Sequence, residues 1–124
     1  MIKFVHTGDL HLGFKFLNPS FKGDTAKERR RELWSTFERI VEYSMEAKVD
    51  FLFIAGDLFE EAYFTIGDIK RVRDTFKKAL DVNIIIAAGN HDYIGRKSLY
   101  NRIEWTENVN IFNSKAIEKM SLKI

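Results

Sequence analysis

Apolar residues along the chain fall into short solid runs and longer periodic stretches, and the two kinds alternate. The solid runs, at residues 2–7, 49–55 and 82–88, are rich in β-branched and aromatic side chains and predict buried strands. The periodic stretches, at 26–47 and 66–80, carry apolar residues at helical spacing with charged residues on the opposite face. This alternation predicts an α/β fold with a parallel sheet and right-handed crossovers.

Shorter signals extend this pattern. Thr65 and Asp68 have the spacing of a capping box at the start of the second helix. Residues 12–25 contain the only proline and two glycines, and they predict a loop. A short helix is expected at 98–103 and a fourth strand at 109–112. The last seven residues, EKMSLKI, alternate as a strand does.

Polar residues directly follow three of the solid apolar runs. Asp9 and His11 come after the first run, Asp57 after the second, and Asn90 and His91 after the third. Because ligands bind beyond the carboxyl ends of parallel strands, these side chains are expected along one edge of the sheet. A carboxylate together with an imidazole suits a divalent transition metal such as Mn²⁺, Fe²⁺ or Zn²⁺. The sequence therefore predicts a metal site at this edge.

The donor atoms suggest a role for each of these residues. Only one residue separates Asp9 from His11, so both side chains can face one ion if the segment is extended. Asp57 can bridge two ions roughly 3.5–4 Å apart, and Asn90 offers an amide oxygen to the second. His91 is expected to protonate a leaving oxygen or to stabilise negative charge. Asp-x-His and Gly-Asp also occur as ordinary turns, whereas GNHD at 89–92 is rare by chance.

Composition limits the class of protein. The 124 residues fit one domain, and an apolar content of 45% is enough for a globular core. The net charge of +2 permits a polyanionic partner without requiring one. The absence of cysteine excludes disulfides and thiolate metal sites. The N-terminus becomes polar too early for a signal peptide and no apolar run is long enough for a membrane span, so a cytoplasmic location is expected.

Three motifs, GDLHLG, GDLF and GNHD, resemble the first three motifs of calcineurin-like metallophosphoesterases. The longer segments HTGDLHLG, VDFLFIAGDLFE and NVNIF look most like those of SbcD-type DNA double-strand-break repair exonucleases. The resemblance covers nearly the whole chain. It implies a metallophosphoesterase-like fold, with sheet layers flanked by helices. It also implies a hydrolase, namely an exonuclease or endonuclease of DNA repair and recombination.

The same resemblance implies the ligand set and the partners. Asp9 and His11 would hold the first metal, Asp57 would bridge, Asn90 would bind the second metal, and His91 would assist at the leaving group. The implied cofactors are two divalent ions, most often Mn²⁺. The implied partners are DNA, an SbcC-type coiled-coil ATPase and a second copy of the chain.

The sequence departs from this family in its histidines. Members supply a single histidine and a Gly-His-x-His pair later in the chain, whereas this sequence has three histidines in all and none after His91. Residues 1–124 are therefore expected to be the N-terminal part of a longer nuclease domain, with the second half of the fold missing. Weak metal binding and little catalysis are expected of such a chain. Dimerisation could cover its open sheet edge.

Two alternative functions stay open, a phosphodiesterase acting on a small molecule with the same metals, and a non-catalytic module that keeps the fold for assembly. Three smaller features also have two interpretations. The basic segment KERRR, 27–31, is typical of a solvated helix face, but it also suits contacts with a nucleic-acid backbone. The aromatic and lysine side chains of 14–22 either close the core or contact DNA. His6, on the strand face of Phe4, is expected to be a partly buried structural histidine.

Overall fold

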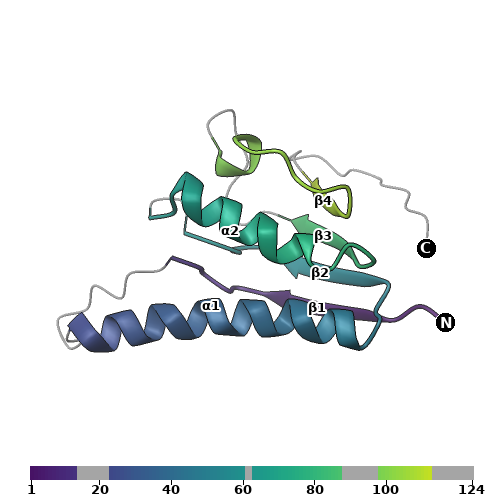
Figure 1. Cartoon of the computed structure of the whole chain (residues 1–124), viewed down its shortest axis with the longest axis horizontal. Coiled ribbons are helices and arrows are strands. Elements are labelled where there is room, and N and C mark those ends of the chain that lie inside the picture. Colours follow the sequence, from purple (N-terminus) through teal and green to yellow (C-terminus); the bar gives the residue numbers. More distant parts are fainter. Residues whose placement is uncertain (14–22, 61–62, 88–97, 113–124) are drawn as a thin grey trace.

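The computed structural model describes residues 1–13, 23–60, 63–87 and 98–112. Within these residues, four parallel strands form one sheet in the order β1-β2-β3-β4 (Figure 1). The predicted α/β fold is confirmed. In chain order the elements are β1 (Phe4–Gly8), α1 (Gly23–Glu46), β2 (Phe51–Ala55), α2 (Ile66–Lys77), β3 (Asn83–Ala87), the 3-10 helix η1 (Leu99–Asn101) and β4 (Val109–Phe112).

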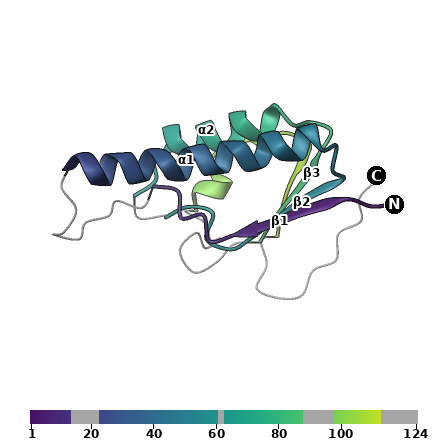
Figure 2. The ribbon, with the colours of Figure 1, turned by 90° about the horizontal axis from the view of Figure 1, so that it is seen from below.

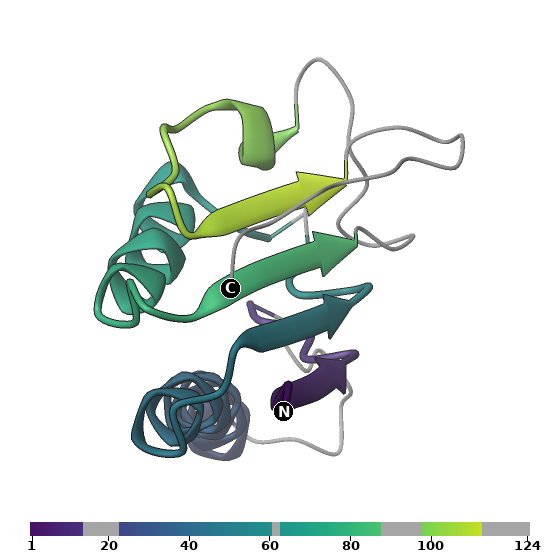
Figure 3. The same ribbon diagram turned by 90° about the vertical axis from the view of Figure 1, so that its right-hand side faces the viewer.

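The two long helices lie on the same face of the sheet (Figures 2 and 3). Each crossover leads to the next strand in the same direction, so a constant right-handed turn places every helix on one side. In β2 and β3, fully buried residues therefore alternate with half-buried ones. The buried set, packed in one core with α1 and α2, is Leu52, Ile54, Ile84 and Ile86, and the half-buried set includes Phe51, Phe53 and Ile85.

The opposite face of the sheet was expected to be covered as well, because the strands are apolar on consecutive residues. Among the described residues, no helix packs there. Phe4 is 61% exposed on this face, and its ring contacts Phe53 edge-on. His6, two residues further along β1, is exposed, so the expectation of a partly buried histidine is wrong. The physical reason is that alternate residues of β1 point away from the helices.

Both predicted helices form close to their expected bounds. In α1, Phe37, Val41 and Ser44 are buried, and the Ser44 hydroxyl donates to the Ile40 carbonyl within the helix. In α2, the capping box is present. The Asp68 backbone N–H donates to the Thr65 hydroxyl, and the Thr65 N–H donates to the Asp68 carboxylate.

Two residues predicted on the apolar face of α2 are instead exposed. Ile66, the first residue of α2, is 38% exposed. Leu80 is 52% exposed, because α2 ends at Lys77 and the helical period no longer applies beyond it.

The last described elements also agree with the sequence pattern. Ser98 caps the short helix η1, and β4 has the predicted bounds. The buried Asn108 side chain donates to the carbonyls of Phe76 and Ala79, which ties the start of β4 to the end of α2. The alternating segment at the end of the sequence lies outside the described residues. No helix within the described ranges is long and apolar enough to cross a membrane.

Candidate metal centre

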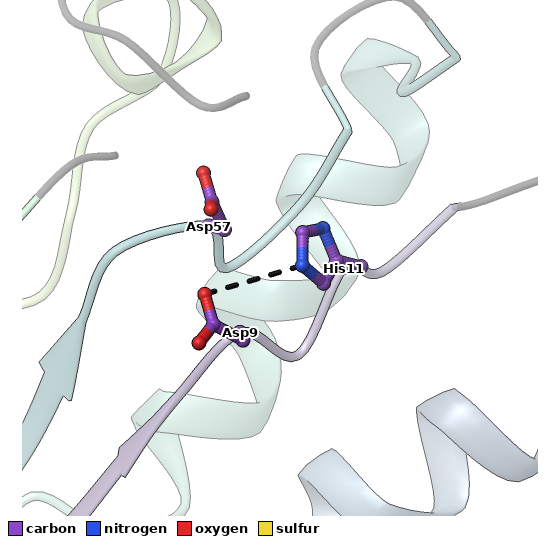
Figure 4. Close-up of side chains that lie close together, drawn as sticks. All are labelled: Asp9, His11 and Asp57. Carbon is purple, nitrogen blue, oxygen red and sulfur yellow. Dashed lines mark ion pairs between the residues drawn. The ribbon is translucent and has the colours of Figure 1, made fainter. Parts of the chain in front are cut away.

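Asp9, His11 and Asp57 come together just beyond the carboxyl ends of β1 and β2 (Figure 4). Each offers one ligand atom, and these atoms all lie within 4.8 Å of one another. Asp9 Oδ1 and His11 Nε2 are 4.0 Å apart. Two carboxylates and one imidazole are a donor set that suits Mn²⁺, Fe²⁺ or Zn²⁺. The residues therefore fit a divalent metal ion, and they come from two segments almost 50 residues apart in sequence.

Backbone hydrogen bonds join the two loops that carry these side chains. The parallel ladder of β1 and β2 continues past the strand ends, where the His11 N–H donates to the Asp57 carbonyl at 2.8 Å. The Leu12 N–H donates to the Leu58 carbonyl at 2.9 Å, and the Glu60 N–H donates to the Leu12 carbonyl at 2.9 Å. Backbone hydrogen bonds therefore set the relative position of the two ligand-bearing loops.

All three side chains project from left-handed backbone, with φ of 53° at Asp9, 48° at His11 and 48° at Asp57. Such conformations cost of order 1–3 kcal/mol for a residue other than glycine, although Asp and His tolerate them better than most. The expected reason for the convergence of Asp9 and His11, an extended segment with alternate side chains on one side, is therefore wrong. The two side chains meet because the chain turns sharply at each of them.

Two glycines at the strand ends allow this geometry. A Cβ atom on Gly8 would lie 2.6 Å from the Ala55 carbonyl oxygen of the neighbouring strand, so no larger residue fits without a backbone shift. Gly56 has a φ of 76° immediately before Asp57. Gly89, the glycine of the GNHD motif after the third run, lies outside the described residues.

Glu60, a buried residue without a predicted role, contacts the imidazole of His11. Its Oε1 lies 2.6 Å from His11 Nδ1, and the residue is only 7% exposed. A carboxylate at this distance favours the tautomer with the proton on Nδ1, which leaves Nε2, the atom facing Asp9, for a metal. A sequence signal existed, because Glu60 directly follows two apolar residues, Leu58 and Phe59, that continue a buried segment.

The third predicted loop is not among the described residues. Asn90, proposed as a ligand of a second metal, and His91, proposed as the leaving-group acid, both lie there. Their roles stay predictions.

Comparison with known proteins places this site in a family. Residues 2–121 match the family model described as calcineurin-like phosphoesterase. The chain belongs to this family. Metallophosphoesterases bind divalent metals, which agrees with the cluster of Asp9, His11 and Asp57.

Curated relatives are similar at about the same level of identity. The uncharacterized metallophosphoesterase YhaO of Bacillus subtilis is 30% identical over 123 residues, which cover 97% of this chain and 30% of that protein. The DNA double-strand break repair protein Mre11 of Methanopyrus kandleri is 30% identical over 117 residues, which cover 89% of this chain and 23% of that protein. The DNA double-strand break repair protein Mre11 of Aeropyrum pernix is 31% identical over 94 residues, which cover 74% of this chain and 21% of that protein. The chain thus spans less than a third of the length of these relatives.

Proposed function

We propose that this chain contributes a divalent-metal centre to a phosphodiesterase that cleaves DNA. The observation that carries the proposal is the cluster of Asp9, His11 and Asp57 at the carboxyl edge of the sheet in a calcineurin-like phosphoesterase. The similarity to archaeal proteins named for DNA double-strand break repair supports DNA as the substrate.

Each residue has a defined task in this proposal. Asp9 and His11 would hold one divalent ion such as Mn²⁺, Asp57 would be shared with a second, and Asn90 of the third loop would be a ligand of that second ion. Bound ions supply Lewis acidity to the phosphoryl group and activate water. His91 delivers a proton to the leaving oxygen or stabilises its charge.

Further ligands of the second ion have to come from outside these four residues. The only remaining histidine of the sequence, His6, is exposed on β1, two residues before that strand ends at Gly8, and is not part of the cluster. The proposal therefore includes a longer nuclease, in the cytoplasm, with an SbcC-type coiled-coil ATPase and a second copy of the chain as partners. These parts rest on the sequence resemblance.

Calorimetric titration with Mn²⁺ tests the metal centre directly. We expect Mn²⁺ binding that is lost in Asp57→Asn, which keeps the side-chain shape but removes the charge. The matched control is Asp81→Asn, an exposed aspartate after α2, which should bind Mn²⁺ as the unchanged chain does. Equal binding by the unchanged chain and Asp57→Asn would contradict the metal centre.

Substrate preference is tested by comparing hydrolysis of labelled DNA with hydrolysis of bis(p-nitrophenyl) phosphate at saturating Mn²⁺. The proposal expects low but Mn²⁺-dependent cleavage of DNA that Asp57→Asn abolishes. Cleavage of the small diester alone would favour a small-molecule phosphodiesterase. Mn²⁺ binding without cleavage of either substrate would favour a non-catalytic module.

A further inference from the structure

A basic cavity lies between the first turns of α1 and the start of α2, and its lining reaches Gly13, two residues after the candidate ligand His11. Its volume is about 600 Å³. Lys27, Arg30 and Arg31 of α1 and Arg71 of α2 line it, and among the described residues of the lining Asp68 supplies the one carboxylate. The three α1 cations belong to the KERRR segment, which the metal site does not use. The cavity thus gathers positive charge from two helices at one place.

The acidic group among the described lining residues is already engaged. Asp68 is the N3 residue of the α2 capping box, and its carboxylate accepts from the Thr65 N–H at 3.1 Å. Within the described residues, Arg31 makes a loose contact of 3.9 Å with Glu28 on the same helix face, where both side chains are largely exposed. Such exposed pairs contribute little. The net positive character of the cavity is therefore not cancelled by its own lining.

The Arg71 guanidinium is held in place before any ligand arrives. It donates to the Glu38 carboxylate at 2.8 Å, and its carbon lies 4.0 Å from the centre of the Trp34 ring. The guanidinium carries five N–H groups, so one ion pair does not exhaust its donors. A planar, pre-positioned guanidinium is the side chain best suited to phosphate oxygens.

An aromatic column links the cavity to the metal-binding loop. The Trp34 ring is parallel to Phe64 within 9°, and Phe64 is parallel to Phe59 within 8°, at a centroid distance of 4.7 Å. Phe59 adjoins Glu60, the partner of His11. Gly13, two residues after His11, lines the cavity, and a Cβ there would lie 2.7 Å from the Phe64 ring. Packed rings therefore fix the cavity relative to the candidate metal centre.

The direction of the helices explains this placement. Both helices return against the strands, so their first turns lie at the end of the molecule where the strands end (Figures 1 and 2). The metal-binding residues lie at that same end.

From this geometry we infer that the cavity binds phosphates of a DNA strand whose scissile bond lies at the metal centre. The inference rests on the proposed function, and it adds a site for the sequence-independent part of binding. Cations that neutralise phosphates release counterions, so their contribution falls with added salt. The Trp34 ring of the lining is already packed against Phe64 on one side and against the Arg71 guanidinium, so it favours phosphate contacts over base stacking.

The test is fluorescence anisotropy of labelled single-stranded DNA with the 124-residue chain, from 50 to 200 mM salt, in EDTA to prevent cleavage. The pocket variant is Lys27→Gln/Arg31→Gln. The matched control, Arg29→Gln/Arg39→Gln, removes the same charge from the same helix at exposed residues that do not line the cavity. Circular dichroism verifies that both variants remain folded.

We expect the pocket variant to bind DNA roughly tenfold more weakly at low salt, with a shallower dependence of log K on log salt by about 1.4, as two lost phosphate contacts require. The control should change affinity by less than about threefold. Equal losses of DNA affinity in the two variants, or no loss in either, would contradict phosphate binding by the cavity. The proposal that the metal centre cleaves DNA would still stand. Absence of DNA binding by the unchanged chain would contradict both phosphate binding by the cavity and DNA as the substrate. Hydrolysis of bis(p-nitrophenyl) phosphate would then show whether the proposed phosphodiesterase activity still holds.

Discussion

In β2 and β3, five consecutive residues each follow the regular ladder, and every second side chain is fully buried under the helices. Two residues past the end of β2, Asp57 has positive φ, a half-buried carboxylate and two candidate metal ligands as neighbours. The body of the sheet and its carboxyl edge are thus continuous in backbone hydrogen bonding but opposite in chemistry.

The difference shows how a stable scaffold carries an unfavourable site. Apolar side chains in the body gain about 25 cal/mol per Å² of surface removed from water. At the edge, Asp9, His11 and Asp57 combine left-handed backbone with neighbouring carboxylates that repel one another in the absence of a cation. The edge keeps its shape because the hydrogen-bonded body holds it, and a metal ion would compensate its charge.

The largest expected effect tests the body of the sheet. Ile86→Ala should lower the free energy of unfolding by about 2–5 kcal/mol, because Ile86 is fully buried. Ile85→Ala, the adjacent isoleucine on the half-buried face, should cost roughly 1 kcal/mol. Urea denaturation followed by circular dichroism measures both. Similar losses at the two positions would mean that the second face is covered as fully as the first.

The second prediction concerns the support of the edge. Glu60→Gln removes the charge that orients His11, so Mn²⁺ affinity should fall about 10- to 100-fold, as for other partners of metal-binding histidines. Glu107→Gln, an exposed glutamate, is the matched control and should bind normally. Calorimetry on both variants decides, and an unchanged affinity in Glu60→Gln would show that the ring needs no such partner.

The smallest expected effect tests the conformational cost of the edge. Asp57→Gly should raise the metal-free stability by about 0.5–1 kcal/mol while abolishing Mn²⁺ binding, because glycine adopts positive φ without strain. Lys48→Gly is the control, since Lys48 has φ of 52° just after α1, at the opposite end of β2 from Asp57, and should stabilise without affecting Mn²⁺ binding. A loss of stability in Asp57→Gly would mean that its side chain contributes more to the fold than its backbone costs.

The sequence was a good guide wherever one local pattern decided the structure. The capping box of Thr65 and Asp68 is local hydrogen bonding, and it appears as predicted. β4 also has the predicted bounds, because a short and mainly apolar run between turn residues is likewise a local pattern. The sequence was a poor guide at Leu80, because the end of α2 depends on what packs around it.

The site could be predicted only in part. Asp9, His11 and Asp57 were identified by their position after apolar runs, and the structure brings them together. The extended geometry inferred for Asp9 and His11 was wrong, because a dihedral angle that local sterics disfavour is imposed here by hydrogen bonds to a loop 46 residues away. Glu60 was given no role, because its partner is distant in sequence.

By itself the sequence determined the order of strands and helices and the residue types offered at the strand ends, because periodicity and ligand chemistry are local properties. Only the tertiary structure decided that both helices cover one face, that Glu60 orients His11, and that cations from α1 and α2 line one cavity. Each of these depends on which distant segments pack together, and that choice is made by the burial of the whole core rather than by any one stretch of chain.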